Sequence, residues 1–479
     1  MVDGGPVRAP GRPQPVGSVR VLVVAVVVLA TAFALLVEGV RHPDSASSAP
    51  ARHPPAQTAT GAAATIPTVR TVTTVPTVRS SGPMAPPHVS LTASGPSSAG
   101  RTFAYGYDLV RQVPKSLAIP SAQGAVQVAQ SEPGGFAAVP IMGWGVGNPE
   151  LSPGTYDFSG IARQLSFVQA AGEVPVITLC AAPDWMKGGA PGTTDWSNIQ
   201  VAPLSQHYGD FAALSAAVAR SFPQVRYFVV WNELKGFWNP ATGVTDIGGY
   251  TAMYNDTFRA IKAARPDALV GGPYIAMHSM SGPAPASAPT PWGTWGHLGA
   301  GPLWEIAYWL ANKAGADFVA VDGRSFTNDA GLTTDPVSST AKYAAVDRWL
   351  ETQTSLPIVW MESHVLPDPT TSTLDQQTAV RVAALLEMAS SGASVGLQWD
   401  PEQFPTWDEG LWSPAGAPGG GQATPLARTL PAVLNVLAAP VTLVAGTPAG
   451  TLVATGADGT VTVTYSATTA SVTVTGPLH

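Results

Sequence analysis

The stretch Tyr227-Phe228-Val229-Val230-Trp231-Asn232-Glu233 decides the fold that we expect of this chain. Its apolar part is typical of a buried strand, and a carboxylate stands at its carboxyl end. A second run, Pro357-Ile358-Val359-Trp360-Met361, is followed in the same way by Glu362. In a (β/α)8 barrel the carboxyl ends of all strands meet at one mouth, so strands distant in sequence can bring their side chains together. The two runs therefore predict a pair of carboxylates at a barrel mouth.

Apolar runs alternate with segments of helical periodicity from Phe103 onward. Tyr208, Phe211, Leu214 and Val218, for example, recur at the spacing of one helix face. We expect eight strands, at residues 103–110, 136–144, 175–181, 227–233, 269–275, 318–323, 357–362 and 395–400. Eight strands with intervening helices predict an α/β fold, a closed (β/α)8 TIM barrel. An open doubly wound sheet is the alternative, but no glycine-rich phosphate-binding motif follows the first run.

The first hundred residues predict targeting and a linker. Residues 21–37 are almost wholly apolar, and Arg8, Arg12 and Arg20 precede them. A basic flank before an apolar stretch favours a cytoplasmic tail at 1–20, a transmembrane anchor at 21–40 and an exported remainder. A cleaved signal segment, which would give a secreted protein, is the alternative. Residues 41–100 are rich in Pro, Ala, Ser and Thr without an aromatic residue, which predicts a disordered linker.

The pattern changes again near the carboxyl terminus. Residues 426–437 predict a final helix, and runs at 452–454, 461–465 and 472–474 alternate apolar and polar side chains. Asp458-Gly459 is typical of a hairpin turn. We therefore expect a catalytic barrel over residues 101–424, and a final helix with a small antiparallel β appendage over 425–479. A strand from residues 88–91 would be one way to extend that appendage.

Composition excludes several classes of function. The net charge of −7, with only 11% charged residues, argues against a nucleic-acid-binding face. Cys180 is the one cysteine, which excludes an intrachain disulfide and a cysteine-based metal site, and its apolar neighbours predict an inert buried thiol. The histidines form no HExxH motif or cluster, so we expect no metal and no cofactor.

The predicted carboxylate pair suits the cleavage of a glycosidic bond. That reaction needs a proton for the leaving oxygen and a nucleophile or base on the other face of the sugar. In retaining enzymes the two carboxyl groups lie about 5–5.5 Å apart. Taken alone, Glu233 could equally be a catalytic residue or a solvated loop residue. The presence of Glu362 at a second strand end strengthens the catalytic interpretation.

These motifs resemble those of a known group of enzymes. Val230-Trp231-Asn232-Glu233 resembles the strand-4 motif of the large clan of (β/α)8 retaining glycoside hydrolases, and Trp360-Met361-Glu362 resembles the strand-7 nucleophile segment. Tyr156-Asp157-Phe158 and Ala182-Pro183-Asp184-Trp185-Met186 resemble the family-39 branch, which contains β-xylosidases, α-iduronidases and bacterial exopolysaccharide hydrolases. The resemblance covers roughly residues 101–440. It implies a carbohydrate substrate, with Glu233 as the general acid/base and Glu362 as the nucleophile.

The resemblance also implies binding residues around this pair. Asn232 would bond the 2-hydroxyl of the sugar, Trp399 would form a stacking floor beneath it, and Trp185 would line the same site. For both tryptophans a core role is the alternative. His278, which follows the fifth predicted strand, is a candidate substrate contact.

The chain departs from the clan pattern at two strands. Strand 2 lacks the arginine that often supports the nucleophile, and strand 6 carries Val321-Asp322-Gly323-Arg324 in place of His-x-Tyr. Our hypothesis is that Arg324 holds Glu362 ionised and that Asp322 orients Arg324 or a sugar hydroxyl. A surface ion pair between the two is the alternative. A non-catalytic glycan-binding barrel at the cell surface, or a transglycosylase, would also be consistent with this sequence.

Overall fold

The computed structural model describes residues 103–109, 117–131, 135–286, 289–368, 371–403 and 410–476. The predicted tail, anchor and linker lie outside these residues, as does the segment 88–91. Within the described ranges, no helix combines the length and the hydropathy that a bilayer crossing requires.

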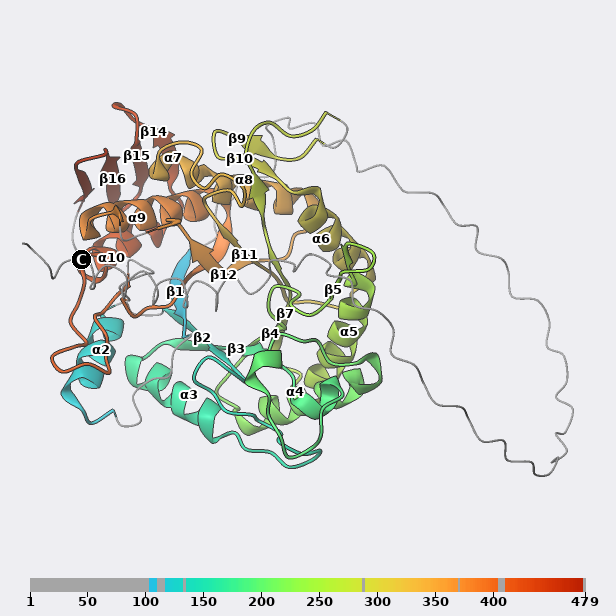
Figure 1. The fold of residues 1–479 in the computed structure, drawn as a ribbon. Helices are drawn as coiled ribbons and strands as arrows, with labels where there is room; N and C mark the ends of the chain where they lie inside the picture. Colours follow the sequence, from blue (N-terminus) through green and yellow to red (C-terminus); the bar gives the residue numbers. More distant parts are fainter. Residues whose placement is uncertain are drawn as a thin grey trace, which may run out of the picture. The chain divides into compact units, whose positions relative to one another are not determined.

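Eight parallel strands close into a barrel in the order β1-β13-β12-β11-β7-β4-β3-β2 (Figure 1). In chain order they are β1 (Ala104–Asp108), β2 (Phe136–Pro140), β3 (Val174–Leu179), β4 (Tyr227–Val230), β7 (Leu269–Ala276), β11 (Phe318–Arg324), β12 (Ile358–His364) and β13 (Ala393–Trp399). Each of the eight predicted strands is present, which confirms the TIM barrel.

Helices follow the strands and surround the barrel (Figure 1). They are α2 (Pro120–Gln130), α3 (Ser159–Ala171), α4 (Tyr208–Ser221), α5 (Ile247–Ala264), α6 (Ala300–Asn312), α7 (Pro336–Ser339), α8 (Ala341–Gln353), α9 (Leu374–Ser391) and α10 (Pro425–Leu437). The helical spacing from Tyr208 to Val218 is thus confirmed in α4. Local signals place the helix starts: Thr373 and Gln376 form a reciprocal capping box at α9, and Thr424 caps α10.

Five predicted strands run past the observed carboxyl ends, and in three of them the overrun contains a left-handed residue. Trp144, Glu233 and Asp400 have φ of 45°, 47° and 58°. Backbone with a positive φ is not extended, so these overruns leave the regular ladder even where their side chains stay apolar. The barrel strands therefore stop before these residues, which turn into the loops at the mouth. Tyr274, which has a φ of 56°, is accommodated inside β7 only because the register of the pairing shifts there.

Two apolar clusters form the core of the fold. The larger lies between strands and helices, and the smaller takes side chains from strands around the barrel, including Phe318, Tyr274, Met361 and Leu397. Such alternation of inward and outward side chains makes the interior a packed core rather than a channel. Functional groups are consequently restricted to the two ends of the barrel.

Small sheets occupy the loops at the mouth. A two-stranded sheet, β5 (Trp238–Asn239) and β6 (Val244–Thr245), follows β4. A three-stranded sheet of β8 (Ser279–Met280), β10 (Gly296–Leu298) and β9 (Trp292–Gly293) follows β7. Three short 3₁₀ helices, at Asp184–Lys187, Trp196–Asn198 and Ser205–His207, follow β3.

The predicted carboxyl-terminal appendage is confirmed as a four-stranded antiparallel sheet. Its strands are β14 (Thr442–Ala445), β15 (Thr451–Gly456), β16 (Gly459–Tyr465) and β17 (Ala470–Thr475), in that order. The β15–β16 loop is Ala457-Asp458, one residue before the predicted turn, because Gly456 pairs with Gly459. The fourth strand in the described sheet is β14, which the sequence pattern did not reveal.

The β14–β17 sheet covers the outer side of α9 (Figure 1). Most residues of α9 are buried, including Gln376, Gln377 and Arg381. Gln376 Nε2 donates a 3.0 Å hydrogen bond to the carbonyl oxygen of Ser466, between β16 and β17. Since α9 lies between the barrel and this sheet, it has no broad solvated face.

Candidate active site

Glu233 and Glu362 both lie at the carboxyl ends of barrel strands, as predicted. Glu233 follows β4 in a tight turn in which Trp231, Glu233 and Leu234 have φ of 70°, 47° and 54°. Left-handed backbone costs about 1–2 kcal/mol for each residue with a β carbon. The buried indole of Trp231 stabilises the turn, because its Nε1 donates a 2.8 Å hydrogen bond to the carbonyl oxygen of Lys235. Packing thus fixes the position of Glu233.

Glu362 is buried and held by hydrogen bonds from two other strands. The Tyr274 hydroxyl donates to Glu362 Oε1 at 2.6 Å, and Asn232 Nδ2 donates to the same oxygen at 3.2 Å. His364 Nε2 lies 3.5 Å from the other oxygen, Oε2. Two donors on Oε1 orient the carboxylate and leave Oε2 as the oxygen available to a ligand.

Irregular pairing in the barrel brings Tyr274 and Glu362 to the mouth. The register between β7 and β11 shifts at Tyr274, and the register between β11 and β12 shifts at Met361. A bulge of this kind adds one residue to a strand and redirects the side chain that follows. Met361 belongs to the cluster inside the barrel, and Glu362 directly after it bonds Tyr274 of the same cluster. The bulges therefore interrupt the alternation where the site begins.

Glu233 forms an ion pair with Lys235 and shares a hydrogen bond with Asp322. Burial acts to raise the pKa of Glu233, but Lys235 and the bond with Asp322 outweigh it and lower that pKa to about 2. Asp322 on β11 behaves in the opposite way. Burial, together with the carboxylates of Glu233 and Glu362, raises the pKa of Asp322 well above its usual value. Of these two carboxyl groups, Asp322 therefore has the higher affinity for a proton and Glu233 the lower.

A further buried carboxyl, Asp108, stands at the end of β1. Burial raises its pKa well above the usual value, and the nearby carboxylates of Glu362 and Asp400 act in the same direction. Asp108 pairs in register with Trp399 on β13. The mouth thus concentrates acidic groups in different environments, an arrangement that allows some to hold protons while others remain ionised.

The structure places the other predicted residues as follows. Trp399 is half-buried, with its ring 5.4 Å from that of His364, beside the predicted nucleophile. His278 is exposed at the end of β7 and interacts electrostatically with Glu233. Asn232 bonds Glu362, and its buried Oδ1 has no hydrogen-bond partner within the described part of the chain.

Two predictions need correction. Arg324 is exposed and its guanidinium lies 5.7 Å from the ring centre of Phe326, with no ion pair to Glu362 or Asp322 among the described residues. Tyr274 and Asn232, rather than Arg324, hold the nucleophile candidate. Trp185 is buried, and its Nε1 donates a 2.9 Å hydrogen bond to the carbonyl oxygen of Glu150. Its place is in the packed loop after β3, which is the core role.

Sequence reasoning missed Tyr274, Lys235 and Asp108. All three lie at or just beyond the carboxyl end of a strand, which is where a barrel places functional side chains. Inspection of every polar residue at such positions would have identified them. The clan pattern has its tyrosine on strand 6, whereas the tyrosine that bonds Glu362 here lies on β7, the fifth barrel strand.

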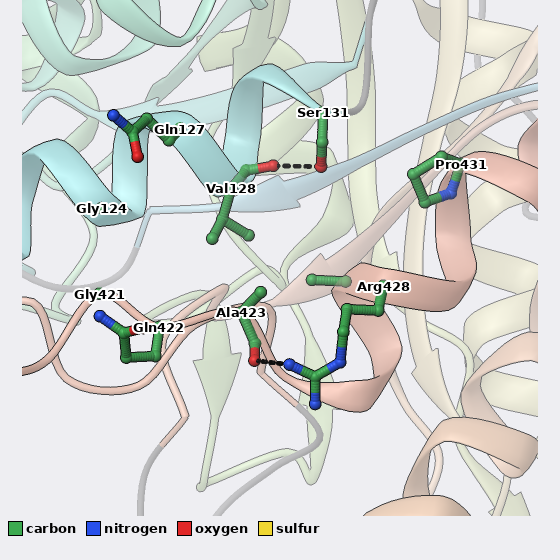
Figure 2. Close-up of a pocket in the computed structure, with 10 residues that line it drawn as sticks. Gly124, Gln127, Val128, Ser131, Gly421, Gln422, Ala423, Arg428 and Pro431 are labelled. Atoms are coloured by element: carbon green, nitrogen blue, oxygen red, sulfur yellow. Dashed lines mark hydrogen bonds between the residues drawn. The ribbon is translucent and has the colours of Figure 1, made fainter.

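A separate cavity of about 450 Å³ lies between α2 and α10 (Figure 2). Its polar groups include Gln127, Gln422 and Arg428, and no carboxylate lines it. Arg428 donates a 2.6 Å hydrogen bond to the carbonyl oxygen of Ala423. This cavity offers no acid or base, so the candidate active site remains at the mouth. Among the described residues, no group of three or more His, Cys, Asp or Glu is arranged to hold a metal ion.

Comparisons with known proteins agree with the observed architecture. No family model and no curated protein sequence matches the chain. Among solved structures, a monomeric β-xylosidase from Caulobacter crescentus CB15 matches with a TM-score of 0.51 and 19% identity, over 77% of this chain and 75% of that chain. The GH39 enzyme from Xanthomonas axonopodis pv. citri matches over 77% of this chain and 73% of that chain, with 18% identity and a TM-score of 0.48. The first of these matches establishes a shared fold: this chain adopts a (β/α)8 barrel like that of a glycosidase, as its strand-end motifs predict.

Proposed function

We propose that this protein is a retaining glycoside hydrolase that cleaves a polysaccharide or oligosaccharide with Glu362 and Glu233. The observation that carries the proposal is the oriented Glu362 carboxylate, whose Oε1 accepts hydrogen bonds from Tyr274 and Asn232. A nucleophile needs a fixed direction of attack, and this anchoring leaves Oε2 for the anomeric carbon. The Asn232 Oδ1 atom is an acceptor without a partner in the described structure, which suits a sugar hydroxyl.

The two steps of the reaction use the proton shared by Asp322 and Glu233. In the first step Glu362 attacks the anomeric carbon, the bond to the leaving oxygen breaks, and Glu233 protonates that oxygen. Asp322 supplies the proton that Glu233 lacks in the free protein, through their hydrogen bond. In the second step Glu233 removes a proton from water, which attacks the glycosyl–Glu362 ester and releases the sugar with retained configuration. The proton taken from water restores the Asp322–Glu233 pair.

A mechanism-based label tests this assignment. The fold match to a β-xylosidase makes 2-deoxy-2-fluoro β-xylosides and β-glucosides with a dinitrophenolate leaving group the first reagents. We expect one equivalent of label on the peptide that contains Glu362, with release of dinitrophenolate. Absence of label and of turnover across both anomers of an aryl glycoside panel would favour the alternative of a glycan-binding barrel.

We further propose that the barrel acts outside the cytoplasm, anchored through residues 21–40. The proposal is supported by the apolar run at residues 21–37, which follows three arginines in the sequence. Carbonate extraction of membranes tests the anchor, because an anchored barrel stays in the membrane pellet. Protease added to intact cells tests export, because an exported barrel is digested from outside. Recovery of the full-length chain in the soluble fraction would contradict the proposal.

A further inference from the structure

A cavity of about 600 Å³ is lined by residues of α8, α9 and β14, the edge strand of the final sheet, which lie next to one another in Figure 1. Sites for small molecules usually have volumes of about 300–1,000 Å³. The polar residues that line this cavity are Thr294, Ser338, Arg348, Glu387, Ser390 and Thr442. None of them belongs to the candidate active site, so a ligand held here is bound apart from the catalytic groups.

Glu387 of α9 is a buried carboxyl group that faces this cavity. The residue is only 8% exposed, and no donor in the described part of the chain bonds to its side chain. Burial raises the pKa of Glu387 to about 7. Buried polar groups are normally hydrogen-bonded, so a carboxyl group that the fold leaves without a donor or acceptor is a position at which a ligand can bind.

Arg348 of α8 lines the same cavity with the opposite charge. Its exposed guanidinium acts electrostatically on Glu387, but the two side chains form no ion pair within the described residues. A guanidinium only donates hydrogen bonds, and an ionised carboxylate only accepts them. A hydroxyl group does both, so a hydroxyl placed between Arg348 and Glu387 bonds the two side chains together.

The rest of the lining has both polar and aliphatic groups. Ser390 Oγ donates a 3.1 Å hydrogen bond to the backbone carbonyl oxygen of Glu387, which leaves the lone pairs of its hydroxyl as acceptors. Thr442 adds a second hydroxyl, while Leu443 and Leu452 provide an aliphatic surface. A pyranose ring has hydroxyl groups at its rim and C–H groups on its faces, so it matches a cavity with these two kinds of surface.

From these contacts we infer that the cavity between α8, α9 and β14 is an accessory site that binds a neutral sugar unit of a glycan through Arg348, Glu387 and Ser390. The site does not depend on hydrolysis at Glu362. Thr294, between β9 and β10, brings one end of the cavity to the loops at the mouth. A glycan held here therefore has a raised effective concentration at the mouth.

A charged ligand suits this cavity less well than a neutral one. The ionised forms of Arg348 and Glu387 carry opposite charges that sum to zero, so the lining has no net attraction for an anion or a cation. In mildly acidic solution the Glu387 carboxyl is largely protonated, because its pKa is about 7, and it is then a poor counter-ion for an ammonium group. Hydroxyl groups bond either form of the carboxyl.

Disaccharide binding to the full-length chain tests the inference. The probes are xylobiose, cellobiose, mannobiose and lactose, with leucine as a zwitterionic comparison, in a detergent without a sugar headgroup. Equilibrium dialysis on a Glu362→Gln background avoids consumption of the probes. Thr442→Phe fills the cavity from an exposed strand position. Val444→Phe is the matched control, because Val444 is 53% exposed on the same strand and does not line the cavity.

We expect Thr442→Phe to bind one equivalent less of at least one disaccharide at saturation than Val444→Phe does. Equal binding of every disaccharide by the two variants overturns the inference, whether or not the mouth is occupied. Loss of leucine binding alone also overturns it, because the cavity then recognises charge. Melting temperatures of both variants confirm that they are folded.

Arg348→Met tests the guanidinium, with Arg259→Met as the control. Arg259 is an arginine on α5 with a side chain that is 63% accessible. Arg348→Met keeps the aliphatic stem and removes the donors, so Kd for the bound disaccharide should rise by about tenfold, or about 1.4 kcal/mol. An unchanged Kd in this variant contradicts the assignment, and the control should bind as the parent does.

Activity and binding distinguish failure of this inference from failure of the proposed function. On the Glu362 background, kcat/KM for short aryl glycosides should be the same with and without Thr442→Phe, because the substitution is outside the mouth. If no aryl glycoside is hydrolysed, the proposed function fails and dialysis still decides the accessory site. If hydrolysis is intact and both variants bind every disaccharide equally, only the accessory site is refuted.

Discussion

The hydroxyl of Tyr274 on β7 donates a 2.6 Å hydrogen bond to Oε1 of Glu362 on β12, although β11 lies between the two strands. Burial raises the pKa of Tyr274 well above its usual value, and the Glu362 carboxylate adds to that effect, so the phenol stays a donor. A charge-assisted bond inside the protein is stronger than a neutral one. The contact therefore sets the orientation of the Glu362 carboxylate.

Tyr274→Phe removes that donor with little change in volume. We expect kcat/KM for aryl glycosides to fall by about 10- to 100-fold, because a hydrogen bond to a charged group contributes about 1.5–3 kcal/mol. Tyr254→Phe is the matched control, since the Tyr254 hydroxyl bonds the carbonyl oxygen of Gly315, outside the site. A variant at Tyr274 that retained wild-type turnover would remove the argument for this contact.

Glu233→Gln and Glu362→Gln should differ in their dependence on the leaving group. Loss of the acid is expected to cost about 10²–10⁴-fold on poor leaving groups, and little on dinitrophenolate, which needs no proton. Loss of the nucleophile should abolish turnover of every aryl glycoside. The measurement is log kcat/KM against the pKa of the leaving phenol for each variant. Identical slopes for wild type and Glu233→Gln would refute the acid role.

Trp399→Ala and Trp185→Phe should separate binding from stability. Trp399 is partly exposed beside His364, so loss of its ring should raise KM by about tenfold, the equivalent of about 1.4 kcal/mol of stacking. Trp185→Phe loses the hydrogen bond to Glu150 in the packed loop and should lower the melting temperature while KM stays constant. Steady-state kinetics and thermal unfolding of both variants check this, and the reverse pattern would invalidate the two assignments.

Asp347→Asn should flatten the pH dependence of stability. Burial raises the pKa of Asp347 to about 7, although Ser391 and the Nε1 of Trp360 donate hydrogen bonds to it. The unfolded value is about 3.9, so the folded state binds the extra proton and stability falls as the pH rises from about 4 to about 7. This contribution is on the order of a few kcal/mol.

Urea unfolding of Asp347→Asn at pH 5 and pH 8 checks the sign. The variant should gain stability relative to wild type at pH 8 and less at pH 5. Asp256→Asn is the control, because the Asp256 side chain is 49% exposed on α5. Glu173 and Glu387, with pKa values raised by burial to about 8 and about 7, act in the same direction, so a reduced slope remains in the variant. An unchanged slope would contradict the assignment to Asp347.

Periodicity and strand-end chemistry were sufficient to predict the barrel and the position of Glu233 and Glu362 near its strand ends. The apolar run before Glu233 forms β4, the run before Glu362 forms the first part of β12, and Asn232 bonds Glu362. Such patterns are local properties of the chain. The barrel brings the carboxyl ends of its strands together at one mouth, so residues at these ends become neighbours. The eight barrel strands and three of the four strands in the final sheet followed from the same kind of signal, whereas β14 did not.

Contacts that depend on backbone irregularity were not predictable in this way. Tyr274 has φ of 56° at a bulge, and a pattern of alternating side chains does not encode that turn. We expected Arg324 beside Glu362 because a buried carboxylate needs a positive partner to stay ionised. The side chain of Arg324 is instead exposed to solvent. The position of Trp185 was not predictable for a similar reason. A tryptophan in a loop can be buried or exposed, and its tertiary contacts determine which of the two occurs.

The sheet formed by β14 to β17 determines where the chain can be truncated at its carboxyl terminus. Arg381 of α9 donates hydrogen bonds of 2.6 and 3.0 Å to the hydroxyl and carbonyl oxygens of Ser363, the neighbour of Glu362. On its other side α9 is bonded to the sheet through Gln376. A recombinant fragment that stops at Leu437 would leave the outer side of this helix bare, so an active preparation has to retain every strand through Thr475.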